Sequence, residues 1–179
     1  MKLSISISSA WKPSMTRTQA QAWSRGSVMP NAFYHGLGIS ERGERLSEKE
    51  LKESVKSILA KGFHVGTGSR DGEEVVNGAM LGNGVYMSEE KRVAERYGQV
   101  LELRINVVNP FIHEGRGPNQ KCWPRQYAQI CRQNKKLGLG LGTTERIGWW
   151  AKQNKIDALS YLNHTVVFDP KNVVVIKEA

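Results

Sequence analysis

Two tyrosines in the middle of the 179-residue chain have a spacing that suits a flat ligand. Tyr86 follows residues 82–85, which predict a glycine-lined turn and a short strand. Tyr97 comes one short predicted helix later, with Ser88 as the expected cap of this helix and Gly98 as its stop. Two rings that approach one cleft from a strand and a helix form a slot for a planar heterocycle. The alternative is that both tyrosines belong to the core or to its rim.

His35 is the second candidate for chemistry. It ends a predicted short strand over residues 32–35, and Gly36 follows it. A polar side chain at a strand end, next to a glycine, can be offered to a ligand that approaches the backbone closely. The alternative is a structural histidine whose hydrogen bonds are satisfied within the fold.

The sequence predicts neither a metal site nor a disulfide. The chain has four histidines and two cysteines: His35, His64, His113, His164, Cys122 and Cys131. The histidines lack the spacing of metal ligands, and the two cysteines are too far apart for a zinc motif and too few for a disulfide framework. We therefore expect free thiols, as in a cytosolic protein.

Positive charge is concentrated in residues 113–155. The formal net charge of the chain is +9, and this segment alone contributes +7. Its bases are interleaved with four aromatic residues: Trp123, Tyr127, Trp149 and Trp150. Bases attract phosphate and flat side chains stack on nucleobases, so the segment favours a nucleic acid or another polyanion as partner.

Within this segment, Arg132, Lys135 and Lys136 are expected to bind that partner, and Trp123 is expected to add stacking if it is exposed. The alternative is a solvated basic loop whose tryptophans are held in the core.

The elements that would position these residues are short and dispersed. Capping boxes at residues 16–19 and 47–50 predict two helices, the second ending at Gly62. Residues 100–108 alternate apolar and polar side chains, which predicts a half-buried strand. A further helix is expected over residues 144–154, and residues 165–168 and 173–176 are expected to pair as a closing hairpin.

This order of elements is typical of an α+β domain, because strict alternation of strands and helices is absent. We expect one domain over residues 28–179 with a basic insertion at 113–155, preceded by an N-terminal arm and short helix over residues 1–27. No apolar run is long enough to cross a membrane, and no signal peptide is apparent. The expected location is therefore the cytoplasm, or a host cytoplasm after delivery.

Several short motifs follow one another along the chain in the order that is typical of a known superfamily. The sequence has FYHG at residues 33–36, ILAKGF at 58–63 and GNGVY at 82–86, and Ala94, Tyr97 and VVFDP at 166–170 continue the pattern. Together they resemble the ADP-ribosyltransferase superfamily, in the His-Tyr branch shared by diphtheria-like toxins and poly(ADP-ribose) polymerases. The resemblance covers roughly residues 28–112 and 156–179 and leaves 113–155 unmatched.

The resemblance implies an ADP-ribosyltransferase-like split β-sandwich with peripheral helices, which holds NAD⁺ as co-substrate between two small sheets. His35 would hydrogen-bond a ribose hydroxyl, and the backbone of Gly36 would hold the nicotinamide carboxamide. Tyr86 and Tyr97 would sandwich the nicotinamide ring. Ala94 stands where the family often has a serine, so the serine hydroxyl's hydrogen bond to the carboxamide is missing.

The main departure from the family is His164, at a position where members usually have Glu and sometimes Gln. A neutral imidazole can accept a hydrogen bond from the ribose or deprotonate an acceptor near neutral pH, but it does not supply a negative charge. Three interpretations stay open. His164 substitutes for the carboxylate; or Asp157, Glu73 or Glu74 enters the cleft; or the domain binds NAD⁺ without transfer.

The resemblance thus implies a mono-ADP-ribosyltransferase that acts on a macromolecule, as a bacterial or phage toxin or effector. The chemistry would break the bond to nicotinamide through an oxocarbenium-like state, and an acceptor nucleophile would then attack. The basic segment favours RNA or DNA over protein as acceptor. The rival interpretation is a catalytically silent module that binds NAD⁺ or nucleic acid, and hydrolysis of free NAD⁺ is a weaker option. An antitoxin or inhibitor protein is a further expected partner; no metal and no membrane contact are expected.

Overall fold

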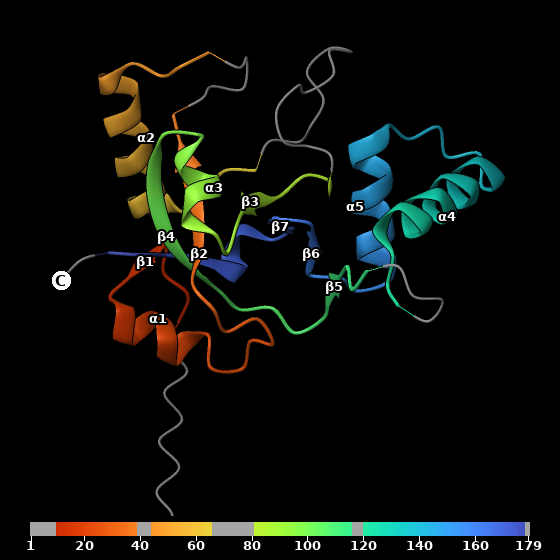
Figure 1. The fold of residues 1–179 in the computed structure, drawn as a ribbon, viewed down its shortest axis with the longest axis horizontal. Coiled ribbons are helices and arrows are strands. Elements are labelled where there is room, and N and C mark those ends of the chain that lie inside the picture. The colour runs from red at the N-terminus through yellow and green to blue at the C-terminus, as the bar shows by residue number, and fades with distance from the viewer. Residues whose placement is uncertain (1–9, 39–43, 66–80, 116–119, 178–179) are drawn as a thin grey trace, which may run out of the picture.

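Two four-stranded sheets form the centre of the molecule in a computed structural model, which describes residues 10–38, 44–65, 81–115 and 120–177 (Figure 1). The first sheet has the strand order β1-β8-β4-β2, and the second has the order β3-β7-β6-β5. The first sheet consists of β1 (Ser14–Met15), β2 (Phe33–Leu37), β4 (Gln99–Ile105) and β8 (Val173–Ile176). The second consists of β3 (Val85–Met87), β5 (Pro110–Ile112), β6 (Ala158–Tyr161) and β7 (His164–Val167).

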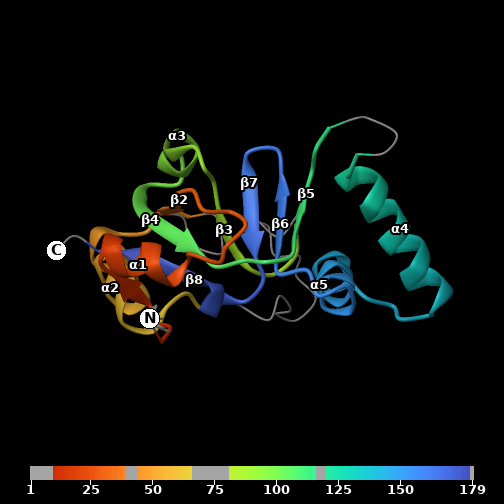
Figure 2. The same cartoon turned by 90° about the horizontal axis from the view of Figure 1, so that it is seen from below.

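Helices surround the two sheets, and the α+β class expected from the sequence is confirmed. They are α1 (Arg17–Trp23), α2 (Glu48–Lys61), α3 (Lys91–Glu95), α4 (Trp123–Lys136), α5 (Thr143–Gln153) and a 3-10 turn, η2 (Pro170–Asn172). Figure 2 shows α1 and α2 beside the first sheet, and α4 and α5 at the far end of the molecule beyond the second sheet. Within the described ranges, no helix has the length and apolar character that crossing a membrane requires.

Local capping accounts for where two of these helices begin. The side chain of Thr16 accepts a hydrogen bond from the backbone of Gln19 in α1, and Ser47 forms the same capping box with Glu50 in α2. Gly62 ends α2 with a φ of 84°, a conformation that favours glycine. The predictions for these helix ends are confirmed.

The expected cap of α3 is wrong. The helix begins at Lys91 with Glu90 as its N-cap, and no side chain caps it. Ser88 instead accepts a hydrogen bond at its Oγ from the backbone N–H of Glu90, at 3.0 Å, within the turn that precedes the helix. The helix also ends at Glu95, so Tyr97 lies beyond it rather than on its buried face.

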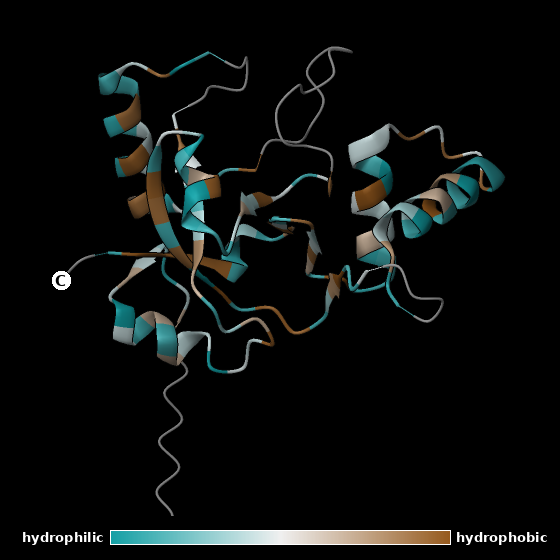
Figure 3. Cartoon of the chain, in the orientation of Figure 1, coloured by the Kyte–Doolittle hydropathy of each residue, from teal (hydrophilic) through white to brown (hydrophobic). Residues whose placement is uncertain are grey.

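The inner faces of the two sheets pack against each other and form the inter-sheet core. From the first sheet, Leu101, Leu103 and Ile105 of β4 are buried, as their alternation predicted. From the second sheet, Val85 and Val167 lie in the same cluster. Figure 3 shows the hydrophobic stretch along β4. Burial of these apolar side chains holds the two sheets together.

The outer face of the second sheet is covered by α4 and α5. Phe111 and Leu159 from the strands pack with Trp123 of α4 and with Ile147 and Trp150 of α5. The rings of Phe111 and Trp150 meet edge to face, with centroids 5.6 Å apart. α4 and α5 therefore form a packed layer and not a solvated loop.

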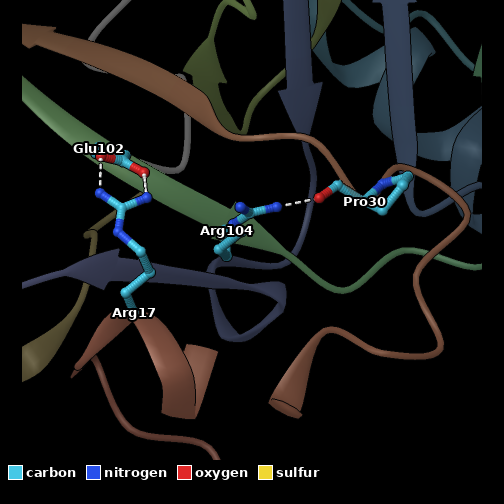
Figure 4. A network of polar contacts seen from close by, with 4 residues as sticks. All are labelled: Arg17, Pro30, Glu102 and Arg104. Atoms are coloured by element: carbon cyan, nitrogen blue, oxygen red, sulfur yellow. Dashed lines mark hydrogen bonds and ion pairs between the residues drawn. The ribbon is translucent and has the colours of Figure 1, made fainter. Parts of the chain in front are cut away.

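The N-terminal part of the described chain belongs to the domain. β1 pairs in parallel with β8, and Met15 and Ala20 pack on Val174. Arg17 of α1 forms a bidentate ion pair with Glu102 of β4, with N–O distances of 2.6 and 2.8 Å, and Arg104 donates to the carbonyl of Pro30 (Figure 4). β1 and α1 thus pack on the first sheet, and residues 1–9 lie outside the described residues.

The predicted pairing of the two closing strands is also wrong. β7 lies in the second sheet between β3 and β6, whereas β8 lies in the first sheet between β1 and β4. η2 joins them, and Asp169 Oδ1 accepts a hydrogen bond from the Lys171 N–H in this turn. β8 is apolar on both faces, and β7 has a valine on each face, Val166 on one and Val167 on the other, so their pattern does not specify which neighbour each one takes.

Candidate functional site

The site forms where an edge strand of the first sheet meets an edge strand of the second. The Tyr34 N–H of β2 donates to the Ser88 carbonyl at 2.8 Å, and the Ser88 N–H donates back to the Tyr34 carbonyl at 3.0 Å. Ser88 directly follows β3, so this pair of hydrogen bonds joins the two sheets at one point. The next residue of β2 is His35.

His35 is held against Tyr86 by a short hydrogen bond. Its Nδ1 lies 2.6 Å from the Tyr86 backbone oxygen, and because a carbonyl only accepts, Nδ1 carries the proton. The ring also meets Phe63 edge to face at 4.9 Å. Burial lowers the pKa of His35, which keeps the ring neutral near pH 7. Nε2 is then a hydrogen-bond acceptor for an incoming hydroxyl.

Gly36 brings the end of α3 onto β2. A Cβ at this position would lie 2.1 Å from the Ala94 carbonyl oxygen and 2.7 Å from Tyr97 Cβ. Both distances are far shorter than a van der Waals contact, so only glycine allows this approach. This close contact between β2 and the end of α3 brings together four of the expected site residues: His35, Gly36, Ala94 and Tyr97.

Replacing Gly36 with alanine should therefore destabilise the protein by about 1–3 kcal/mol, the usual cost of overpacking, because backbone atoms must move. Gly148 is the matched control, since it lies within α5 and a Cβ there would contact nothing within 4 Å. Gly148→Ala should stabilise by about 0.5–1 kcal/mol through helix propensity. Denaturant unfolding measures both. Equal stability of Gly36→Ala and the wild type would show that β2 and α3 are not in close contact.

The Tyr86 ring is fixed by its hydroxyl. The hydroxyl donates to the Gly82 carbonyl at 2.8 Å and accepts from the Leu81 N–H at 2.9 Å. The ring packs on the core beneath α4 and α5, and burial raises the pKa of Tyr86, so the phenol stays neutral. Tyr97 differs, because 45% of its surface is exposed. The Tyr86 ring is thus held in place by hydrogen bonds, whereas the Tyr97 ring is open to solvent.

His164 is the first residue of β7 and faces Tyr161 across the β6–β7 hairpin. The next residue, Thr165, pairs with Met87 of β3. Because side chains alternate along strands, His164 lies on the same face of the sheet as Tyr86, which pairs with Val166. No hydrogen bond or ion pair to the His164 side chain is found in the part of the chain that the structure describes. The ring is thus available to a ligand.

Asp157 does not reach this place, so its proposed role as the missing carboxylate is wrong. It precedes β6, at the opposite end of the β6–β7 pair from His164. Its Oδ2 accepts hydrogen bonds from the N–H groups of Val108 and Asn109, at 2.6 and 3.0 Å. Asp157 therefore has a structural role in the turn before β5. The other two candidates, Glu73 and Glu74, lie outside the described residues.

The three bases expected to bind an acceptor are exposed on α4. Arg132, Lys135 and Lys136 are spaced by three and four positions, which places them on one side of the helix. Trp123 is only 5% exposed and lies in the core. The expectation that it stacks on an acceptor is therefore wrong, because its ring is covered by Phe111 and Trp150.

The structure thus brings five expected residues together around β2, β3 and α3: His35, Gly36, Tyr86, Ala94 and Tyr97. His164 stands on the neighbouring strand of the second sheet. Two surface hollows lie elsewhere, one beside α2 and one between α4 and α5. Within the described ranges, no group of three or more His, Cys, Asp or Glu side chains is placed to hold a metal ion. Sequence reasoning missed the Tyr86 carbonyl, since every residue has this group and no residue type marks it.

Comparison with models of protein families gives no match, and a search of curated proteins gives no significant match either.

Proposed function

We propose that the protein is a mono-ADP-ribosyltransferase that cleaves NAD⁺ and transfers ADP-ribose to a macromolecular acceptor, with nucleic acid favoured over protein. The observation that carries the proposal is the hydrogen bond from His35 Nδ1 to the Tyr86 carbonyl. This hydrogen bond joins His35 and Tyr86, which belong to two separate motifs of the resemblance. It also places the proton on Nδ1 and leaves Nε2 as an acceptor. The proposed fold is the split β-sandwich of that superfamily, and the two sheets joined at Tyr34 and Ser88 support it.

In this proposal the chain's own residues position the reacting bond. His35 Nε2 accepts a hydrogen bond from a ribose hydroxyl, and the Gly36 backbone binds the carboxamide. Tyr86 and Tyr97 stack on the two faces of the nicotinamide ring, with Tyr86 fixed and Tyr97 closing on the ligand. Holding NAD⁺ in a reactive geometry supplies most of the rate enhancement, because the leaving group is already cationic.

The proposed reaction breaks the bond between the ribose C1 and the nicotinamide nitrogen, and nicotinamide leaves with the electron pair. An oxygen or nitrogen of the acceptor then forms a bond to C1 and loses a proton. His164, on the face of the second sheet that also carries Tyr86, accepts a hydrogen bond from the ribose or takes this proton. Because its imidazole lacks the charge of a carboxylate, a single transfer is proposed rather than polymer elongation.

The acceptor class is tested by labelling. The purified protein is incubated with NAD⁺ labelled in the adenylate and with a cell lysate, and the labelled material is treated separately with RNase, DNase and protease. We expect a nuclease to release the label and protease to leave it. Label released only by protease would identify a protein acceptor, and no labelled macromolecule with intact NAD⁺ would favour the silent binding module.

The exposed bases of α4 give a prediction for acceptor binding. Replacing Arg132, Lys135 and Lys136 with Gln should weaken binding of single-stranded nucleic acid. The slope of the logarithm of the binding constant against the logarithm of the salt concentration should fall by about two units, roughly 0.7 for each base removed. NAD⁺ affinity should stay nearly unchanged, since the three bases are exposed on α4 and none belongs to β2, β3 or α3. Fluorescence anisotropy at several salt concentrations measures this.

The control removes three bases from α2 instead, at Lys49, Lys56 and Lys61, which are exposed. It lowers the net charge equally but leaves α4 unchanged. An equal loss from both triple variants would mean that the total charge attracts nucleic acid and that α4 has no special role.

A further inference from the structure

A surface hollow of about 530 Å³ lies where the end of α4 meets the start of α5. Its lining residues are Cys131, Asn134, Lys135, Gly138, Gly140 and Arg146. They include two cations and an amide but no carboxylate. The hollow is also distinct from the site at β2 and β3, because its lining residues all belong to α4, α5 and the segment that joins them.

Asn134 is an uncompensated donor in this lining. The residue is only 4% exposed, and its Nδ2 has no hydrogen-bond partner among the residues that the structure describes. It occupies a position on the buried side of α4, together with Trp123 and Ile130. A buried amide without a partner is costly, and an acceptor oxygen in the hollow would remove that cost.

Arg146 supplies the second feature. It is half-buried, its Nε donates to the Leu141 carbonyl at 2.6 Å, and its Nη1 lies 3.8 Å from Cys131 Sγ. These contacts fix the plane of the guanidinium. No carboxylate pairs with it in the described chain, and the nearest acid in sequence, Glu145, instead accepts from the Gly142 N–H at 3.0 Å. A fixed guanidinium without an acidic partner is suited to an external anion.

The rest of the lining leaves room for a ligand. Gly138 and Gly140 both have a φ of 64°, and a Cβ at either position would meet nothing within 4 Å. Lys135 is exposed on the adjacent turn of α4 and adds a mobile positive charge. The lining therefore offers donors of three kinds: a planar guanidinium, an ammonium and an amide.

We propose that this hollow binds a phosphate group. A phosphate has several acceptor oxygens and up to two negative charges, so one group can engage Arg146, Lys135 and the Asn134 amide together. The hollow is open to solvent, so the phosphate can belong to a nucleic acid backbone or to a small phosphorylated molecule. The proposal needs neither NAD⁺ nor transferase activity, so the two proposals can fail separately.

The test is a titration of the ¹⁵N-labelled protein with inorganic phosphate, at constant ionic strength and without NAD⁺. The readout is the side-chain amide signal of Asn134, assigned by its loss in Asn134→Ala. We expect this signal to shift and to saturate. Lys135→Gln should weaken phosphate binding by about tenfold, the value of one charge-assisted hydrogen bond. Arg125→Gln, on the same helix but outside the hollow, should change the binding less than about twofold.

Two results would overturn the proposal: an Asn134 signal that does not move up to high phosphate, or equal weakening by Lys135→Gln and Arg125→Gln, which would indicate only diffuse attraction. Arg146→Lys gives a second check, since it keeps the charge but loses the planar fork, and it should weaken binding as well. Competition by a short single-stranded oligonucleotide would identify the source as a nucleic acid backbone; competition by a nucleoside monophosphate alone would identify a small molecule. Either result supports phosphate as the ligand.

Discussion

His164→Ala should lower the turnover of NAD⁺ by about a hundredfold or more, the usual contribution of one positioned acid–base group. His164 begins β7 on the face of the sheet that carries Tyr86, and its ring is available to a ligand. The dissociation constant for NAD⁺ should change little, because the stacking residues and His35 stay in place. The effect should therefore be found in kcat rather than in KM.

A second substitution at this position sharpens the test. His164→Glu places a carboxylate where the resembling family usually has one, and it should exceed the wild-type turnover because a negative charge stabilises the developing positive charge on the ribose. His64→Ala is the matched control, since His64 is exposed beyond the end of α2. Wild-type turnover in His164→Ala would remove this residue from the mechanism.

Tyr97→Ala is expected to weaken NAD⁺ binding by about 1–3 kcal/mol, the range for one aromatic stacking contact, which is roughly tenfold to a hundredfold. Because Tyr97 is 45% exposed, the free energy of unfolding should change by less than about 0.5 kcal/mol. Tyr97→Phe should retain most of the affinity. Isothermal titration calorimetry and denaturant unfolding separate the two effects.

Tyr86 should behave differently, because its ring and hydroxyl are part of the fold. Tyr86→Phe leaves the Leu81 N–H and the Gly82 carbonyl without their partner and should destabilise the protein by about 1–2 kcal/mol while NAD⁺ binding persists.

Leu139→Ala, at another partly exposed apolar residue far from β2, is the control for Tyr97→Ala. Unchanged NAD⁺ affinity in Tyr97→Ala would refute the aromatic slot.

The sequence predicted local structure where a single side chain determines it. The capping boxes at Thr16 and Ser47 and the alternation of β4 specify their elements without help from distant contacts. The partners of β7 and β8 were not predictable, because each strand has a valine on both of its faces and either sheet would bury them. The helix over Trp123–Lys136 was missed for a related reason: its many polar residues conceal the buried positions at Trp123, Ile130 and Asn134.

Part of the candidate site was predictable and part was not. Residue types and spacing, together with the family resemblance, predicted His35, Gly36 and Tyr86 as candidates. The hydrogen bond that joins His35 to Tyr86 uses a backbone oxygen, and the reason for glycine at position 36 is the carbonyl of Ala94. Asp157 was a reasonable carboxylate by sequence, but only the direction of β6 shows that it lies at the wrong end of the strand pair.

The most direct measurement is the release of nicotinamide by the purified protein from NAD⁺ labelled in the nicotinamide ring, in the presence of lysate. The wild type should release label, and the Tyr86→Phe variant should follow it at a temperature where both are folded. A Tyr97→Ala/His164→Ala double variant should release label no faster than buffer. Equal release by the wild type and the double variant, or no release by the wild type with any lysate fraction, would contradict the proposed transferase.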